Sequence, residues 1–424
     1  MKKHLLALSA AAVLLAPQAV GAEGFSINEW SAEGFGMAGA RMFAENDAAN
    51  FAYNPASMTK IQGEKAKISV AYISPHGKWT AEPNDKGIAA GFEGTQYGHN
   101  RVNPAFAPGM YYVKQINDKE WFGMGTYARF GNMCQFERND IVASNAFSSR
   151  MNGVSLGINY ARKHDEKWST SVGAEVNYVG LQLDKNLGMS SPLHVEGTTW
   201  ALGWNAAANY APDKKNEFGV VYRSKVKHSM EADYDVHGTM GNMLGALNTG
   251  DAYGCVTLPE SWMLGYGHKF NDKTRVELNA TWTRWSRFDA FNMALNPGLI
   301  LGLDPQNPYG LNTYLPQPKN WKDGWRYAIG IEHKLSDKYT LLAGMSHDER
   351  GIPDETADFM VPTGERDTYT LGIQYHDKKQ TIAASFGYMD VGDLNMSDHG
   401  GAYSSAKMYD SYTKIFVLSY QYNF

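Results

Sequence analysis

The chain lacks any long apolar run in its body, and its mean hydropathy is negative, at -0.43. A helix needs about 20 consecutive apolar residues to cross a bilayer. After the first 22 residues, no apolar stretch of the sequence reaches about 20 residues without interruption. A bundle of apolar membrane helices is therefore excluded.

Cysteine and net charge are also scarce. The 424 residues include only Cys134 and Cys255, and neither belongs to a Cys-x-x-Cys pair. This spacing of the cysteines, together with the scattered histidines, argues against a zinc site. The two cysteines either form one disulfide or remain two free thiols. The net charge of -5 offers no basic field for nucleic acid. A catalytic triad needs Ser, His and Asn or an acid in mutual contact. We expect no enzyme and no cofactor.

The first 22 residues have the features of a secretory signal peptide. Lys2 and Lys3 precede an apolar run over residues 5–15, and Val20 and Ala22 occupy the -3 and -1 positions of a cleavage site. The run is too short to span a bilayer. We predict a signal peptide over 1–22 and export from the cytoplasm.

The end of the chain, KIFVLSYQYNF, alternates large apolar residues with smaller or polar ones. Successive side chains of a strand point to opposite faces, so this segment has one apolar face. The same period of two recurs over 154–160, 172–178, 276–282 and 369–375. The opposite positions are mostly Gly, Ser, Thr and Asn, whereas a soluble sandwich would place many charges on its outer face. Strands that face lipid fit this pattern better than secreted β-sandwiches.

Short turns and long loops separate the strands. The turns share Asn, Asp or Ser followed by Lys, a composition typical of hairpins; they lie at 117–119, 165–167, 213–215, 271–273, 336–338 and 377–379. We predict about fourteen strands, near 65–76, 104–115, 120–130, 151–163, 167–183, 198–211, 216–228, 257–269, 273–285, 323–334, 338–349, 365–376, 380–390 and 412–424.

In lipid every backbone donor and acceptor must pair internally, so a spanning sheet must close. The predicted fold class is therefore all-β, a transmembrane antiparallel β-barrel over 64–424, with short periplasmic turns and long extracellular loops. Two of the long loops each contain a group of apolar residues. The first group is Phe291, Met293, Leu295, Leu299, Ile300, Leu301 and Leu303, and the second is Met240, Met243, Leu244 and Leu247. These loops pack on each other or form an external groove that collects an apolar ligand.

Residues 23–63 break the pattern, because they are rich in Ala, Gly and Asn and do not alternate. We predict short helical turns over 38–43 and 46–53, with Pro55 ending the second. A segment of this size at the inner end of a barrel fits a small, mainly helical plug in the lumen, where polar wall residues satisfy its backbone. A disordered periplasmic tail is the alternative.

Two stretches of this segment, EGFSINEWSAEGFGMAGA and NDAANFAYNPA, resemble the hatch of the FadL-type outer-membrane transporters of long-chain fatty acids. Further similarity lies in LGWNAAANYAPDKKNEFGVVYRSKVK, LPESWMLGYG, WTRWSRF and WKDGWRYAIGIEH, so it covers essentially the whole mature chain. The resemblance implies a fourteen-stranded barrel in the outer membrane of a Gram-negative cell. It also implies that substrates are caught outside, passed to an internal site gated by the hatch, and released sideways into the membrane.

The resemblance also implies roles for single residues. It gives hatch and gating roles to Phe25 and to the Asn-Pro-Ala signature, which is Asn54, Pro55 and Ala56. Gly131 matches the glycine at the kinked third strand, beside the lateral opening. A glycine permits such a bend, although it also suits a strand end.

Basic residues hold the substrate carboxylate in the family, and the candidates in this chain are Lys185 and Lys319. Lys185 stands where the family has an arginine, and exposed loop lysines are the alternative explanation for both. The loop over 184–197 is shorter than in typical fatty-acid members, so the external groove is expected to differ.

The leading hypothesis is thus passive uptake of long-chain fatty acids, with aromatic hydrocarbons as the alternative on the same fold. A general porin would need an open charged lumen, which the plug argues against. An adhesin or phage receptor role through the loops would be compatible with transport. We expect a monomer whose partners are a hydrophobic small molecule and outer-membrane lipid, without nucleic acid.

Overall fold

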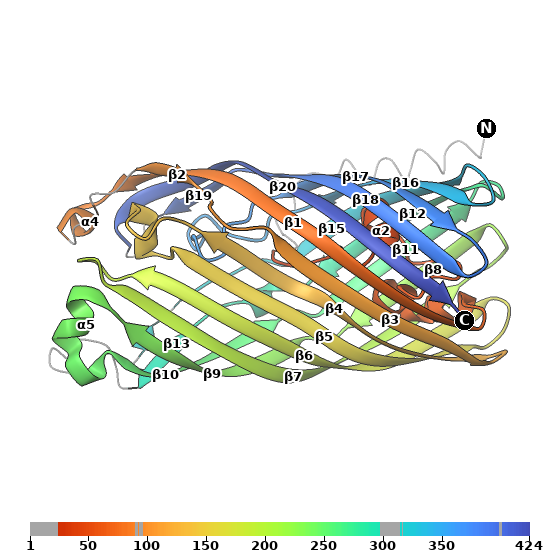
Figure 1. Ribbon diagram of the computed structural model, residues 1–424, viewed down its shortest axis with the longest axis horizontal. Helices are drawn as coiled ribbons and strands as arrows, with labels where there is room; N and C mark the ends of the chain where they lie inside the picture. Colours follow the sequence, from red (N-terminus) through yellow and green to blue (C-terminus); the bar gives the residue numbers. More distant parts are fainter. Residues whose placement is uncertain (1–23, 90–91, 93–95, 297–313, 316, 398–400) are drawn as a thin grey trace.

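The computed structural model describes residues 24–89, 92, 96–296, 314–315, 317–397 and 401–424. Fourteen antiparallel strands close into a barrel, as predicted (Figure 1). In barrel order they are β1 (Glu64–Pro83), β3 (Ala105–Asn117), β4 (Glu120–Gln135), β5 (Ser148–Lys163), β6 (Trp168–Asn186), β7 (Pro192–Tyr210), β8 (Asn216–Arg223), β11 (Ser261–Lys269), β12 (Thr274–Thr283), β15 (Gly324–Lys334), β16 (Tyr339–Asp348), β17 (Arg366–His376), β18 (Gln380–Val391) and β20 (Tyr403–Asn423). β20 pairs with β1 and completes the barrel.

Shorter strands lengthen the wall at one end. They are β2 (Tyr97–His99), β9 (Val226–Val236), β10 (Thr249–Leu258), β13 (Met293–Asn296), β14 (Tyr314–Leu315) and β19 (Leu394–Ser397). β9 pairs with the outer part of β7, β10 with β9, and β13 with β10. α4 (Asp85–Ala89) and α5 (Gly238–Leu244) lie at this end, which we call the loop end, and the C-terminus lies at the other (Figure 1).

The predicted short turns all lie at the other end of the barrel, the turn end. In each turn the Asn, Asp or Ser side chain accepts a hydrogen bond from the backbone N–H two residues later. Asp165, for example, accepts from the Lys167 N–H at 2.7 Å, and the equivalent bonds in the other turns span 2.7–3.3 Å. The side chain thus supplies the bond that holds the turn.

The outer face is apolar and is bordered by aromatic rings. Trp168 packs against Tyr210 near the turn end, with ring centroids 4.6 Å apart, and Tyr178 packs on Trp200 farther out. Trp200 lies ten residues from Tyr210 on β7, which is about 33 Å along a strand. Once the strand tilt is included, this distance matches an apolar band about 25 Å tall between two aromatic belts. The outer face therefore meets lipid.

The predicted strands agree with the structure at the turn end, and several of them are too short at the loop end. β1 continues to Pro83, β7 begins at Pro192 and β20 begins at Tyr403. The intervals left between the predicted strands at 184–197, 229–256 and 391–411 are therefore largely strand, and 77–103 is strand over 77–83 and 97–99. Beyond the membrane the outer face no longer needs apolar residues, so the alternation that revealed the strands disappears there.

The residues before β1 form short helices: α2 (Ala32–Gly36), α3 (Asn50–Tyr53) and the 3-10 helix η1 (Pro55–Lys60). The Ser31 hydroxyl caps α2 by accepting from the Gly34 N–H at 3.0 Å. The helix predicted over 38–43 is wrong, because Ala38 and Gly39 have positive φ and turn the chain there. The second prediction is partly right, since α3 ends before Pro55. Among the described residues, no helix is long and apolar enough to cross a membrane.

Residues 24–63, which we call the N-terminal segment, lie inside the barrel and are almost entirely buried. Their large side chains lie against inward-facing glycines of the wall. A Cβ atom added to Gly387 would lie 2.4 Å from the Phe35 ring, and one added to Gly344 would lie 2.4 Å from the Met37 carbonyl carbon. Phe43 and Phe51 contact other wall glycines in the same way. The missing side chains of the wall make room for those of the segment.

Candidate functional site

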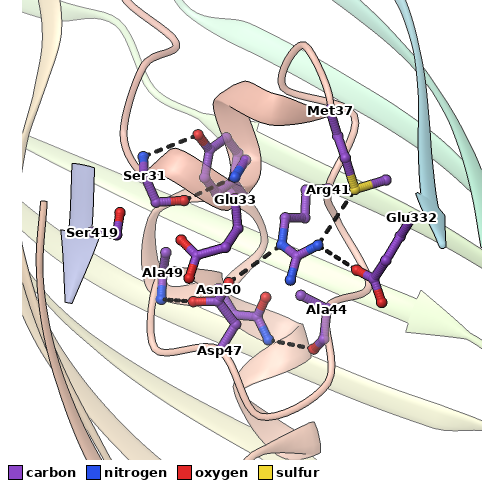
Figure 2. A network of polar contacts seen from close by, with 12 residues as sticks. Ser31, Glu33, Met37, Arg41, Ala44, Asp47, Ala49, Asn50, Glu332 and Ser419 are labelled. Atoms are coloured by element: carbon purple, nitrogen blue, oxygen red, sulfur yellow. Dashed lines mark hydrogen bonds and ion pairs between the residues drawn. The ribbon is translucent and has the colours of Figure 1, made fainter. Parts of the chain in front are cut away.

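A buried network of charges joins the N-terminal segment to the wall (Figure 2). Lys67 on β1 contacts Glu33 at 2.9 Å and Asp47 at 2.5 Å. Arg41 contacts Asp47 at 3.3 Å and also Glu332 on β15. Because both strands contribute a partner, the network holds the segment between the two sides of the lumen.

Asp47 is the centre of this network. Burial by itself would raise the pKa of Asp47, but the Lys67 ammonium and the Arg41 guanidinium outweigh it and hold the pKa at about 2. The same carboxylate accepts a hydrogen bond from the Ala49 N–H at 2.9 Å, next to α3. The charged form of Asp47 therefore organises the fold of the segment as well as its attachment.

The Asn-Pro-Ala signature forms a second attachment point. Asn54 is extended, and its side chain caps η1 by accepting from the Ala56 N–H at 3.2 Å, while Pro55 starts that helix. The Asn54 amide also donates to Asn209 on β7 at 2.6 Å. Asn209 in turn donates to Ser57 at 2.8 Å. The signature thus combines a helix start with a bond to the barrel wall.

The barrel wall has a gap between β3 and β4. Pairing of β1 with β3 continues to Ile73 and Ala105, whereas pairing of β3 with β4 stops at Met110 and Thr126. β4 continues to Gln135 without its β3 neighbour. One edge of β4 is therefore released from the sheet over 127–135.

The released edge of β4 is bent and is covered from inside. The register with β5 shifts between Ala128 and Phe130, at a β-bulge. The Ile27 N–H donates to the Arg129 carbonyl at 2.9 Å, and the Gly131 N–H donates to the Phe25 carbonyl at 2.9 Å.

Gly131 itself lies inside β4, beside the bulge and not at the strand end. An added Cβ there would lie 2.5 Å from Ile27 Cδ1, the end of a flexible side chain, so the glycine eases the close approach of the segment.

A cavity of about 370 Å³, which we call the lateral cavity, opens at this gap. Phe25, Phe130 and Cys134 border it on the lumen side. Phe106 and Val154, which also border it, belong to the exposed outer face. The lateral cavity therefore connects the lumen with the lipid-facing surface.

The ring of Phe25 lies in a cage of aromatic side chains. Its ring lies edge-to-face against Trp285 at 4.8 Å, Phe288 at 5.4 Å, Trp321 at 5.7 Å and Phe130 at 5.8 Å between centroids. The ring is buried. Such contacts are favourable geometries for aromatic pairs, so the cage selects a flat ring.

Lys185 and Lys319 come together near one carboxylate and do not border the lateral cavity. Lys319 is buried and forms an ion pair with Asp358. Lys185 lies at the outer end of β6, within electrostatic reach of the same Asp358. Neither lysine is the exposed loop residue of the alternative interpretation. Val361, which borders the cavity, lies three residues after Asp358, so the partner of Lys319 is close to the cavity along the chain.

Sequence reasoning missed Arg366, the cation that borders the lateral cavity. Its guanidinium contacts Asp348 at 3.1 Å, and Arg326 contacts the other oxygen of Asp348 at 2.9 Å. Glu29 of the N-terminal segment borders the same cavity. Burial raises the pKa of Glu29, although the hydrogen bond from the Asn28 backbone and the charge of Arg366 act to lower it. No pattern in the sequence singles out Arg366, because its position at the cavity depends on the curvature of the whole barrel.

The remaining predictions concern the loops and the cysteines. Phe291, Met293 and Leu295 are buried with other loop residues, whereas Leu299–Leu303 lie outside the described residues. On α5, Met243 is exposed and Leu244 is buried. These groups therefore mainly pack on the loops. Cys134 and Cys255 are free thiols. In the described part of the chain, no group of His, Cys, Asp and Glu side chains is arranged to hold a metal ion.

A closed antiparallel barrel with an apolar outer band, a filled lumen and a gap in its wall defines a class of outer-membrane transport barrels. The chain belongs to the outer membrane protein transport protein family (OMPP1/FadL/TodX), whose model matches residues 12–424. It is thus a FadL-type outer-membrane transporter of hydrophobic compounds.

Individual relatives are distant but match over most of their length. The long-chain fatty acid transport protein of Escherichia coli K12 is 24% identical over 90% of this chain and 91% of its own. Outer membrane protein P1 of Haemophilus influenzae is 26% identical, over 88% and 87%.

Solved structures show the same fold. A Pseudomonas aeruginosa FadL homologue has a TM-score of 0.82 at 20% identity, over 95% of this chain and 100% of its own. The Pseudomonas putida toluene transporter TodX has a TM-score of 0.70 at 16% identity, over 94% and 99%.

Proposed function

We propose that the protein takes up long-chain fatty acids by passive diffusion and releases them sideways into the outer membrane. The observation that carries this proposal is the lateral cavity, which leads from the lumen to the lipid-facing side of the β3–β4 gap. An apolar chain that leaves through this gap never enters water, so its transfer costs no hydrophobic free energy. Relatives named as long-chain fatty acid transport proteins support the substrate class.

The N-terminal segment acts as a hatch in this proposal. At the turn end Lys60 contacts Glu217 at 2.6 Å and Lys269 contacts Glu45 at 3.0 Å, which ties the segment to β8 and β11 and favours a sideways exit. Asn54, Pro55 and Ala56 hold the body of the hatch, as described above. Phe25 and its neighbours gate the passage, because their hydrogen bonds to β4 cover the inner side of the gap.

We further propose that Arg366 binds the fatty-acid carboxylate in the lateral cavity. Arg366 and Arg326 share the single carboxylate of Asp348. Because Arg366 shares this partner, its guanidinium can also take the carboxylate of a ligand at the edge of the apolar cavity. Lys185, with Lys319 and Asp358, forms a second site for the same head group, deeper in the loop end.

Aromatic hydrocarbons are the second candidate substrates. The aromatic cage around Phe25 favours them, because it already holds a single benzene ring without any polar contact to that ring. A small aromatic compound would fit the cage when Phe25 moves out. Solved relatives described as toluene transporters belong to the same fold.

Uptake by cells that lack their own transporter tests both candidates. We expect the wild-type protein to restore growth on oleate and initial uptake of labelled oleate, with slower uptake of toluene. Uptake of toluene alone would replace the fatty-acid proposal with the second candidate. If neither compound enters faster than in cells with an empty vector, both proposals are wrong.

A further inference from the structure

The outer aromatic belt continues across β8, β11 and β12. Tyr222, Trp262 and Trp282 are direct cross-strand partners, and the Tyr222 and Trp262 rings lie 4.7 Å apart. Such belts mark the level at which hydrocarbon gives way to lipid headgroups. Side chains just beyond them toward the loop end therefore face the headgroups of the outer leaflet.

Four basic residues lie just beyond this part of the belt. We call them the outer basic patch, and they are Lys225, Lys227, Arg284 and Arg287. The strands keep them together, because Arg223 pairs with Ser261 and Ser261 pairs with Thr283, immediately before the patch begins. The Arg284 N–H then donates to the Glu260 carbonyl at 3.0 Å.

The outer basic patch has more positive charge than its neighbours balance. Glu260 contacts Arg284 at 3.2 Å and Arg287 at 3.3 Å. Lys225 and Lys227 are exposed, and neither forms an ion pair or hydrogen bond with a residue that the structure describes.

Two exposed lysines elsewhere at the loop end each pair with an aspartate. Lys78 contacts Asp410 at 2.9 Å, and Lys407 contacts Asp393 at 2.6 Å. These two lysines therefore offer a comparison with Lys225 and Lys227.

A hollow of about 950 Å³ adjoins the patch on the outer wall. It is lined by Trp200, Tyr253, Thr257, Asp289 and Asn292, among others, and lies where β9, β10 and β13 extend the wall (Figure 1). Thr257 is the cross-strand partner of Lys227, so hollow and patch are continuous. Exposed aromatic faces beside hydroxyl, amide and carboxylate groups suit a sugar, whose C–H groups stack on rings and whose hydroxyls donate and accept hydrogen bonds.

We propose that the outer basic patch and this hollow bind one phosphorylated glycolipid of the outer leaflet. Lysine and arginine form charge-assisted hydrogen bonds with phosphate oxygens, and the patch lies at the headgroup level. The acyl chains extend along the belt of Tyr222, Trp262 and Trp282, where the surface is apolar. The sugar occupies the hollow, whose carboxylates, Glu231 and Asp289, accept hydroxyl hydrogen bonds and disfavour a phosphate there.

Binding of purified lipopolysaccharide to the detergent-solubilised full-length protein tests this proposal. We expect the variant Lys225→Gln/Lys227→Gln to bind it roughly tenfold or more weakly, because each basic residue at a lipid surface contributes about 1 kcal/mol. The affinity of the wild type should fall as salt is raised, and the variant should show a shallower dependence. Both lysines are exposed and make no ion pair with the described part of the chain, so the variant should keep its fold, which heat-modifiable migration checks.

The matched control is Lys78→Gln/Lys407→Gln, which removes the same charge from paired lysines of another part of the wall. We expect it to bind like the wild type. Equal losses in both variants, or no loss in either, would overturn the proposal. So would wild-type binding of phosphatidylcholine with the same affinity, or displacement of lipopolysaccharide by millimolar inorganic phosphate, which would indicate a simple anion site.

Discussion

At the scale of single residues, the chemistry of the proposed site depends on buried charged side chains that share their partners. Asp47 is held between Lys67 and Arg41, and it serves attachment of the hatch. Arg366 shares Asp348 with Arg326 and borders the lateral cavity, so it is the charge that a ligand can reach. A buried charge that a ligand neutralises gives selectivity for that ligand.

Arg366→Gln should therefore separate the two candidate substrates. We expect initial oleate uptake to fall about tenfold, because a charge-assisted hydrogen bond of roughly 1.5 kcal/mol is lost. Toluene uptake should stay unchanged. Asp348 keeps its contact with Arg326, so the barrel should still fold.

Arg101→Gln is the control for this substitution, since it removes an exposed arginine that pairs with Glu137 at the surface. It should transport oleate like the wild type. An equal fall for oleate and toluene in Arg366→Gln would show that the residue shapes the passage and does not bind the carboxylate.

At the scale of secondary structure, the barrel departs from a regular sheet at the edge of β4 that β3 leaves. The backbone of the N-terminal segment supplies hydrogen bonds there, at Phe25 and Ile27. Unpaired backbone groups are costly within a membrane, so a gap is tolerated only where protein covers it. The segment therefore stabilises the opening that it also blocks.

A bulky side chain in the opening should stop transport without harming the barrel. Ala107 on β3 borders the lateral cavity, and Ala107→Trp would fill much of the 370 Å³. We expect oleate uptake to fall more than tenfold, while heat-modifiable migration stays normal. Ala280→Trp, on the lipid-facing side of β12, is the control and should transport normally. Undiminished oleate uptake by Ala107→Trp would mean that substrates leave by another path.

At the scale of the whole molecule, the barrel and the N-terminal segment are complementary surfaces. The wall closes by its own strand pairing, from β1 to β20, without a bond from the segment. The segment in turn fills the lumen through glycine contacts and through ion pairs with β1, β8, β11 and β15. The barrel should therefore persist when the segment is removed.

Deletion of residues 23–56, with 1–22 retained for export, should convert the protein into a leaky pore. The charged side chains left in the lumen, such as Lys67 and Glu332, would then face water. We expect a large rise in single-channel conductance in planar bilayers and in the permeability of cells to small hydrophilic solutes. Unchanged permeability, with a barrel that still shows heat-modifiable migration, would mean that the segment is not the plug.

The membrane-spanning strands and their turns could be predicted from the sequence because lipid imposes a local rule. An outward residue must be apolar and its neighbour faces the lumen, so the period of two appears directly in segments such as 369–375. The side chains of Asp165 and its equivalents bond within their own turns, so they too act locally. Outside the lipid this rule ends, and the outer parts of β7, β9 and β10 were therefore missed.

The sequence by itself thus determined the barrel, the short turns at one end and the long loops at the other, and the separate N-terminal segment. Only the tertiary structure decided where the wall opens, which cation borders the cavity and what surrounds Phe25. Arg366, Phe25 and β4 are far apart along the chain and meet because the sheet closes on itself. Contacts of this kind depend on the geometry of the whole barrel, and no local pattern of residues records them.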